Sequence, residues 1–126
     1  MKKILLVAAA VAMTSPLAFA ADYAVDTKGA HASINFKVQH LGDSWRSGRF
    51  NDFYGKFSWD SEVPSQSKIE LTIDTSSVDS NHAERDKHLR SDDFLGASEF
   101  PEAKFVSTKV EDLGDNKLKV YGDFTL

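Results

Sequence analysis

The segment SVDSNHAERDKHLRSDDFL, residues 77–95, is the densest cluster of titratable side chains in this sequence. Its nineteen residues include two His, four Asp, one Glu, two Arg and one Lys. An imidazole beside a carboxylate can exchange protons with a substrate, and the same groups can hold a metal ion. A charged run can equally form a solvated helix. The positions of these residues decide among the three interpretations.

A metal site in this segment needs its ligands on one side of a helix. Glu84, His88 and Asp92 are spaced four apart, so a helix would place them in line. His82 and His88 are six apart, which puts them about 120° apart around a helix axis and prevents them from sharing one ion. The HExxH spacing of helical zinc sites is absent. We therefore predict no metal site, and a metal-linked stress protein using Glu84, His88 and Asp92 is kept as an alternative.

Acid/base catalysis would use His82 or His88 with the nearby carboxylates. The sequence contains no G-x-S-x-G nucleophile elbow, no phosphate-binding P-loop and no glycine-rich dinucleotide fingerprint. Because a general base is identified by its geometry and not by composition, the cluster alone does not indicate an enzyme. We predict a protein that is not an enzyme and has no cofactor.

The third interpretation, a short solvated helix, fits the local sequence. Asn81 can cap a helix, and Glu84 three residues later completes a capping box. Residues 82–91 contain no Gly, no Pro and no β-branched residue. We therefore expect a helical insertion near residues 81–95.

This helix must be held in place by the residues that flank it, because Ala83 and Leu89 are its only apolar residues. The expected ion pairs, Glu84 with Lys87 and Asp86 with Arg90, add only about 0.2 to 0.5 kcal/mol each. We expect the apolar side chains that follow the helix to dock on the rest of the fold. They are Phe94, Leu95 and Phe100.

The rest of the chain alternates between apolar and polar residues, as half-buried β-strands do. In SINFKVQ, for example, Ile34, Phe36 and Val38 share one side. The residues Gly114-Asp115-Asn116 tolerate the positive φ of a hairpin loop. The pattern predicts an all-β fold of short antiparallel strands, a barrel or a sandwich, with about six strands. The expected strands cover residues 23–26, 33–39, 50–60, 68–74, 104–113 and 117–126.

The first twenty residues have the pattern of a secretory signal peptide. Two lysines precede an apolar run over residues 4–13, and Ala18-Phe19-Ala20 forms a small-x-small cleavage site. Residues 14–16 break the run well short of the roughly 20 residues that a membrane span needs. Removal of this peptide on export would leave one domain, residues 21–126, with no transmembrane segment.

Charge and cysteine content exclude several classes of protein. Fifteen Lys and Arg stand against 19 Asp and Glu, a formal net charge of −4, which becomes −6 when the two lysines of the signal peptide are removed. Nucleic acids and anionic lipid surfaces both attract clustered cations, so we expect neither as a partner. With no Cys, disulfides, thiol catalysis and Cys-ligated zinc are excluded.

The last expected strand, KLKVYGDFTL, still alternates where the sequence stops. Val120, Phe124 and Leu126 share one side, and no turn or polar tail follows them. An unpaired hydrophobic edge strand favours aggregation, and proteins normally blunt such edges. We therefore expect the sequence to be a fragment of a longer domain.

Four blocks of the sequence carry a resemblance to a known family. They are HASINFKVQHLG (31–42), GRFNDFYGKF (48–57), the charged segment (77–95) and FPEAKF (100–105). In this order and spacing they closely resemble the YceI-like proteins. The resemblance implies a lipocalin-like barrel of eight antiparallel strands in the bacterial periplasm, with an apolar tunnel for a polyisoprenoid or similar amphiphile. It also implies that the domain continues past residue 126, so that closure of the barrel and part of the cavity would be missing here.

The implied function is that of a carrier for a long-chain isoprenoid, such as a quinone or a prenyl phosphate, or for another amphiphilic lipid. An eight-stranded barrel is just wide enough for one slim ligand. An enzyme that modifies such a lipid, with His82 or His88 as acid/base, is the alternative. Monomer and homodimer are both left open.

The residues expected to line the cavity are the apolar ones that alternate along each strand. Tyr54, Val106 and Val110 have the opposite parity in their strands. The expected lining is Ile34, Phe36, Val38, Phe53, Phe57, Trp59, Ile69, Leu71, Ile73, Phe105, Val120 and Phe124. The expected barrel mouth is His82, Arg85, His88, Leu89, Phe94 and Phe100.

Overall fold

The computed structural model describes residues 20–126, so the expected signal peptide lies outside the described residues except for Ala20. These residues form two antiparallel β-sheets and one short helix, which confirms the predicted fold class. In chain order the elements are β1 (Ala21–Ala24), β2 (Ile34–His40), β3 (Ser44–Phe50), β4 (Phe53–Trp59), the 3-10 turn η1 (Pro64–Gln66), β5 (Lys68–Asp74), the 3-10 turn η2 (Thr75–Ser77), β6 (Val78–Asp79), α1 (Ala83–Arg90), β7 (Glu102–Gly114) and β8 (Lys117–Thr125).

Eight strands are present in the described residues, two more than the alternation predicts. The strand β3 was missed because its sequence, SWRSGRF, does not alternate: Arg46 and Gly48 stand opposite the apolar Val38 and Phe36 of β2. The strand β6 is only two residues long and carries no periodic signal. The conformation of β3 is therefore fixed by its pairing with β2 and with Val78 of β6. The residue pattern of β3 itself does not determine it.

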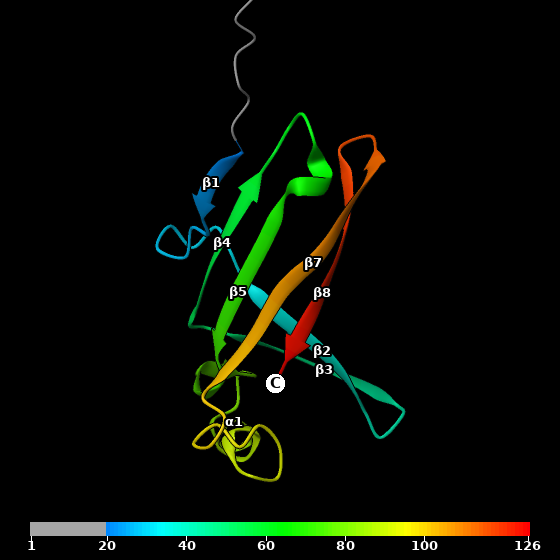
Figure 1. The fold of residues 1–126 in the computed structure, drawn as a ribbon. Coiled ribbons are helices and arrows are strands. Elements are labelled where there is room, and N and C mark those ends of the chain that lie inside the picture. Colours follow the sequence, from blue (N-terminus) through cyan, green and yellow to red (C-terminus); the bar gives the residue numbers. More distant parts are fainter. Residues whose placement is uncertain (1–19) are drawn as a thin grey trace, which may run out of the picture.

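The larger sheet has five strands in the order β1-β4-β5-β7-β8 (Figure 1). Its longest pair, β7 and β8, is joined by a tight turn in which Gly114, Asp115 and Asn116 all have positive φ. This is the hairpin loop that the sequence predicts, because these residue types tolerate left-handed backbone.

The smaller sheet has the order β2-β3-β6, and its β2–β3 hairpin projects away from the larger sheet (Figure 1). The hairpin closes through a hydrogen bond from the backbone N–H of Asp43 to the carbonyl oxygen of His40, 3.3 Å long. The two sheets share no strand and do not close into a barrel.

The buried core is small and lies mainly where the larger sheet meets the helical segment. The Cα positions of Ile73 and Ala103 face each other across β5 and β7, and Thr75 is completely buried just after β5. The Oγ1 of Thr75 donates a 2.7 Å hydrogen bond to the carbonyl oxygen of Phe100, which ties the two segments together. The buried apolar residues are Ile73, Val78, Ala97, Ala103 and Val110.

The only α-helix of residues 20–126, α1, has eight residues. No helix in this part of the chain has the length and hydrophobicity that a bilayer crossing requires.

Candidate functional site

The larger sheet has one apolar face. Residues directly opposite each other on neighbouring strands point to the same face, as do residues two apart on one strand. Phe57 pairs with Ile69, Leu71 with Phe105, and Phe105 with Phe124, so all lie on one side. By these pairings, the apolar face includes Tyr23, Phe53, Phe57, Trp59, Ile69, Leu71, Ile73, Phe105, Val120 and Phe124.

A β-bulge in β7 brings a further apolar residue onto this face. Ser107 pairs with Gly122 but Lys109 pairs with Tyr121, which leaves Thr108 as an extra residue on β7. Beyond the bulge the parity of β7 is reversed. Val110, which differs in parity from Phe105, therefore joins the apolar face opposite Val120, and it is buried.

The other side of the sheet is charged and solvated. Lys56 pairs with Glu70 at 3.2 Å, and Lys104 pairs with Glu102 at 3.1 Å. The Lys109 ammonium contacts the Glu111 carboxylate, and this hydrogen bond lowers the pKa of Glu111. Tyr54 and Val106, which have the opposite parity to the expected lining, are exposed on this polar face.

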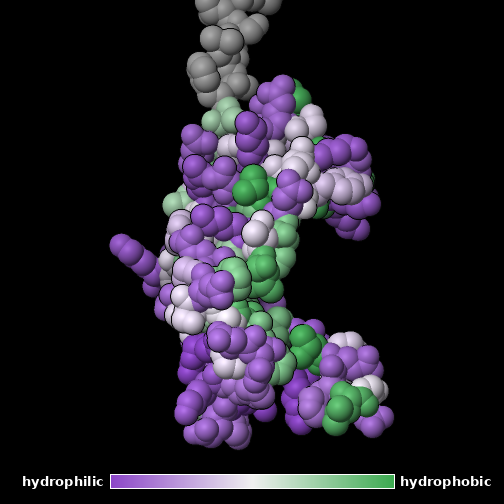
Figure 2. Space-filling view, turned by 60° about the horizontal axis from the view of Figure 1, so that its bottom comes forward, coloured by the Kyte–Doolittle hydropathy of each residue, from purple (hydrophilic) through white to green (hydrophobic). Residues whose placement is uncertain are grey.

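The apolar face is open in the described residues. The ring of Phe124 is 59% exposed, and Phe57 and Val120 are also exposed. Two aromatic rings at the β1 edge, Tyr23 and Phe57, stack with their centroids 4.9 Å apart. Figure 2 shows the molecule hollowed on one side, with hydrophobic residues along the inner margin of the hollow.

The smaller sheet contributes a second apolar face. Ile34, Phe36 and Val38 lie on the same side as Phe50, and the rings of Phe36 and Phe50 are 5.6 Å apart. The twelve residues expected to line a cavity are thus gathered on two faces, nine on the larger sheet and these three on the smaller.

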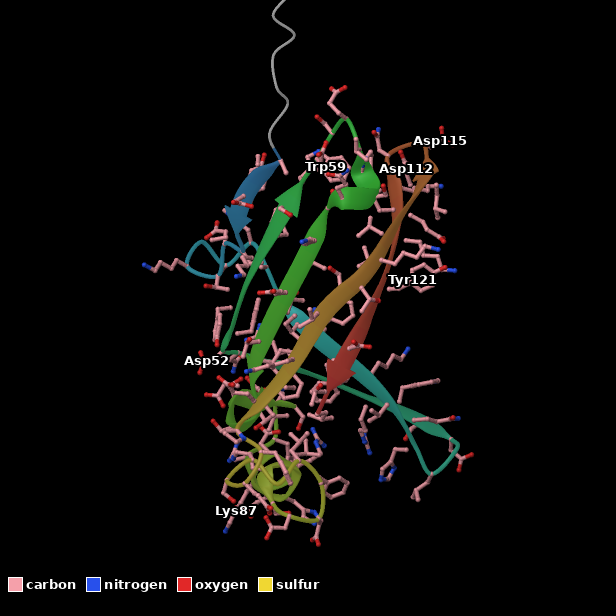
Figure 3. All side chains as sticks on the ribbon, viewed as in Figure 1. Asp52, Trp59, Lys87, Asp112, Asp115 and Tyr121 are labelled. Atoms are coloured by element: carbon pink, nitrogen blue, oxygen red, sulfur yellow. The ribbon has the colours of Figure 1, made fainter. Side chains whose placement is uncertain are left out.

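The helix α1 lies beyond one end of the larger sheet (Figure 1). Figure 3 shows Lys87 of α1 at this end, while Trp59 and the β7–β8 turn with Asp112 and Asp115 lie at the opposite end. The residues expected at a barrel mouth are therefore placed together at one end of the apolar face.

The N-terminal cap of α1 is His82, and the predicted Asn81 cap is wrong. The Nδ1 of His82 accepts a 3.2 Å hydrogen bond from the backbone N–H of Arg85. His82 has the extended backbone that a cap needs, with φ −156° and ψ 106°, whereas Asn81 has φ +62° and lies outside the helix. The sequence rule found the right helix but placed its start one residue early.

A buried carboxylate anchors α1 to the end of β6. Asp86 is 8% exposed, and it accepts hydrogen bonds from the backbone N–H of Ser80 at 2.8 Å and from the Ser80 hydroxyl at 2.5 Å. The bond from this hydroxyl lowers the pKa of Asp86. Arg85 adds two 2.7 Å bonds, from Nε to the Ser80 hydroxyl and from a terminal guanidinium nitrogen to the Ser80 carbonyl.

The ion pairs expected along the helix are not formed. Asp86 binds Ser80 and not Arg90, and no Glu84–Lys87 contact is among the ion pairs within residues 20–126. A carboxylate gains more from two hydrogen bonds in a buried position than from an exposed ion pair.

The expected docking of Phe94 and Phe100 on the sheet is also wrong. Their side chains are 61% and 55% exposed, while Leu95, like Leu89, is half-buried. The ring of Phe94 meets the ring of His88 edge to face at 4.9 Å, and the Nε2 of His88 lies 3.0 Å from Asp93. The helical segment is therefore held by the polar contacts of Ser80, and it exposes two aromatic rings.

The described residues assemble no metal site. Within residues 20–126 no three His, Asp or Glu side chains come close enough to hold an ion. His88 contacts Asp93, which lies outside the proposed trio of Glu84, His88 and Asp92.

The described structure also has a groove that is lined mostly by other residues. It has a volume of about 690 Å³ and runs along the polar residues near the start of β4 and the end of β5. Phe53 is the only expected lining residue that contacts it. Its lining is Thr27, Lys28, Asn51, Asp52, Phe53, Tyr54, Thr72, Asp74, Ser76, Ala97, Pro101 and Glu102. Sequence alternation cannot predict this groove, because loops supply much of its wall.

The chain is similar to several curated proteins. The UPF0312 protein VPA0850 of Vibrio parahaemolyticus is 61% identical over 118 residues, which cover 93% of this chain and 62% of that protein. A UPF0312 protein of Shewanella denitrificans is 64% identical over 107 residues, which cover 85% of this chain and 56% of that protein. The chain thus spans less than two thirds of the length of these two relatives.

Solved structures share the fold. Burkholderia cenocepacia BcnA superposes with a TM-score of 0.69 at 26% identity, covering 75% of this chain and 58% of BcnA. The Campylobacter jejuni YCEI protein superposes with a TM-score of 0.62 at 33% identity, covering 78% of this chain and 57% of that protein. The family model of the YceI-like domain matches residues 23–126. The chain therefore belongs to the YceI-like family.

Proposed function

We propose that this chain binds a long-chain isoprenoid or similar amphiphilic lipid along the apolar face of its larger sheet. The observation that carries the proposal is the segregation of that sheet: apolar side chains from all five strands share one face, and ion pairs occupy the other. An apolar surface that remains open to solvent is a typical site for an apolar ligand.

Burial of the ligand would supply enough affinity without specific head-group chemistry. At about 0.3 kcal/mol per non-hydrogen atom, a tail of roughly forty carbons gains ~12 kcal/mol, which corresponds to nanomolar affinity. A long tail and a wide apolar face therefore suffice for a carrier.

We propose a binding role and not a catalytic one, because the two candidate histidines have structural contacts. The Nδ1 of His82 caps α1, and the Nε2 of His88 lies against Asp93. The helical segment then forms the end of the binding face, where its charged side chains meet water or a polar head group.

We further propose that the protein works in the periplasm. The pattern of residues 1–20 supports export, and cleavage is expected before Ala21. Mass spectrometry of protein recovered from a periplasmic extract would give the N-terminus, and a chain that still began at Met1 in the cytoplasmic fraction would contradict this step.

The ligand proposal is tested with two neighbouring residues of β8 that point to opposite faces. Phe124→Thr removes a ring from the apolar face, and Asp123→Thr makes the same new residue on the polar face. Because Phe124 is 59% exposed, its loss costs the free protein little, but a lipid lying on it would lose an apolar contact. Titration with an isoprenoid quinone, followed through Trp59 fluorescence, should show roughly tenfold weaker binding for Phe124→Thr.

The control, Asp123→Thr, should bind within about twofold of the unchanged protein, since its side chain points away from the ligand. Organic extraction and mass spectrometry of the purified protein should recover a lipid. Equal affinity for both variants, or repeated recovery of protein without lipid, would remove the proposal.

A further inference from the structure

The β2–β3 hairpin presents an apolar side chain at its tip in a conformation that costs stability. Leu41 is 85% exposed, the highest value among the large hydrophobic residues of the described chain. Its φ is +52°, in the left-handed region that disfavours residues with a branched side chain. Two separate costs, exposure and backbone strain, thus fall on one residue. Strain of this kind is retained where a surrounding structure enforces it and often marks a functional position.

The surrounding turn fixes this arrangement. The backbone N–H of Asp43 donates to the His40 carbonyl at 3.3 Å, and the side-chain amide of Gln39 donates to the Gly42 carbonyl at 2.9 Å. Leu41 is therefore held at the end of a hairpin that projects away from the larger sheet (Figure 1).

Two more apolar side chains stand behind the tip. Trp45 is 57% exposed on one side of the hairpin, and Val38 is exposed on the other. The Lys37 ammonium lies 4.8 Å from the centre of the Trp45 ring. A Trp beside a Lys is the pairing found at the boundary between lipid tails and head groups, where the ring is half in apolar surroundings and the cation meets phosphates.

The hairpin is cationic although the chain is acidic. Between Ile34 and Phe50, three cations (Lys37, Arg46 and Arg49) stand against one anion (Asp43), a formal charge of +2. The complete sequence has −4, so the remaining residues together carry −6. The net charge of the whole chain argued against an anionic lipid surface as a partner, but it does not describe this local distribution. Attraction to a surface is set by the charges within about a Debye length of it.

We propose that the β2–β3 hairpin docks the protein on an anionic phospholipid bilayer. Leu41 enters the apolar edge of the lipid layer, Trp45 lies at the head groups, and Lys37 and Arg46 face the lipid phosphates. This goes beyond the proposed function, since docking requires no bound ligand. If both are correct, the hairpin brings the apolar face to the membrane from which a lipid would be taken.

The two tryptophans of the sequence allow a local test. Trp59→Phe leaves Trp45 on the hairpin as the only reporter, and Trp45→Phe leaves Trp59 at the end of the larger sheet opposite α1 (Figure 3). The protein, with its signal peptide removed, is mixed with phosphatidylcholine vesicles with or without phosphatidylglycerol. With phosphatidylglycerol, Trp45 emission should shift to shorter wavelength and be quenched by brominated lipid, while Trp59 emission should not change.

The decisive substitution is Leu41→Asn. Asn tolerates positive φ, so the hairpin should keep its fold and gain stability, while the apolar side chain is removed. Binding to the anionic vesicles should fall at least fivefold. Lys37→Gln and Arg46→Gln should each weaken binding roughly fivefold. Lys117→Gln, which removes a cation from the start of β8, is the matched control and should change binding by less than about twofold.

The outcomes separate this proposal from the proposed function. Unchanged vesicle binding for Leu41→Asn, or equal binding to vesicles with and without phosphatidylglycerol, would overturn docking and leave lipid binding by the apolar face untouched. Quenching of Trp59 alone would also overturn it, because the contact would then lie on the larger sheet. If the unchanged protein bound the vesicles but did not bind the quinone, only the proposed function would be contradicted.

Discussion

The ring of Phe105 on β7 lies directly over Gly122 on β8. A Cβ atom at position 122 would be 2.4 Å from the Cζ of Phe105, well inside van der Waals contact. The other sheet repeats the arrangement, because a Cβ at Gly48 would be 2.3 Å from the Cζ of Phe36. Glycine is unfavourable inside a strand, and here it makes room for an aromatic ring to lie across the apolar face.

Gly122→Ala should therefore destabilise the fold. The new methyl group must displace the Phe105 ring and also approaches the carbonyl oxygen of Val106, at 2.6 Å. Overpacking of this kind costs about 1 to 3 kcal/mol of unfolding free energy, which urea denaturation would measure. In a Phe105→Leu background the same substitution should cost less, since part of the clash has been removed. An identical cost in both backgrounds would mean that the ring does not lie over the glycine.

Asp86→Asn should weaken the anchoring of α1 to β6. The amide oxygen can take the place of Oδ1, which accepts from both the backbone N–H and the hydroxyl of Ser80, but it is neutral, so both hydrogen bonds lose their charge assistance. The expected loss is about 1 to 3 kcal/mol in urea denaturation. Asp92→Asn, an exposed position in the same segment, is the control and should change stability by less than about 0.5 kcal/mol. Comparable losses for both would contradict the anchoring role of Asp86.

The stability of the protein should fall in acid, partly through this same group. The Ser80 hydroxyl holds the pKa of Asp86 below its ordinary value of 3.8. The unfolded chain then binds the proton more readily, so the stabilisation is complete above about pH 4 and is lost as the pH falls through the folded-state pKa. The difference in unfolding free energy between the unchanged protein and Asp86→Asn should be largest at neutral pH and shrink below about pH 4. A difference that does not vary with pH would exclude a proton-linked contribution of Asp86.

His82→Asp should stabilise the protein. Aspartate is a better N-cap than histidine and also places a negative charge at the helix N-terminus, and the two effects together are worth about 0.5 to 1 kcal/mol. Thermal unfolding would show a higher midpoint. Asn81→Gly should be neutral or slightly favourable, because residue 81 has φ +62° and does not cap the helix. A marked loss of stability in Asn81→Gly would indicate that Asn81, and not His82, caps the helix.

Much of the fold could be predicted from the sequence where alternation and turn residues act together. The strands β2, β5 and β8 and the turn at Gly114 were predicted within one or two residues, because their apolar side chains need burial on one face. The strand β3 could not be predicted in this way. The Phe36 ring leaves no room for a side chain at Gly48, and a local sequence pattern does not contain such a contact between strands.

The residues of the apolar face could be predicted from the sequence in part, but their arrangement as a surface could not. Alternation placed Phe105 and Phe124 correctly on one face, yet it could not place Val110, since the bulge at Thr108 depends on pairing with β8. The anchoring of α1 was missed for a related reason. In the sequence Asp86 resembles the other charged residues of the segment, and only the structure shows its hydrogen bonds with Ser80.

Thr108, the extra residue of the bulge in β7, shifts the alternation of the strand by one position. If Thr108 were paired regularly instead of being bulged, the alternation would continue from Ser107 without a shift, carrying the side chains of Lys109 and Glu111 inward and that of Val110 outward. A hydrocarbon chain laid along β7 would then meet two charges halfway along its path. The continuity of the apolar face along β7 therefore depends on one threonine that stays outside the pairing, as well as on the apolar residues themselves.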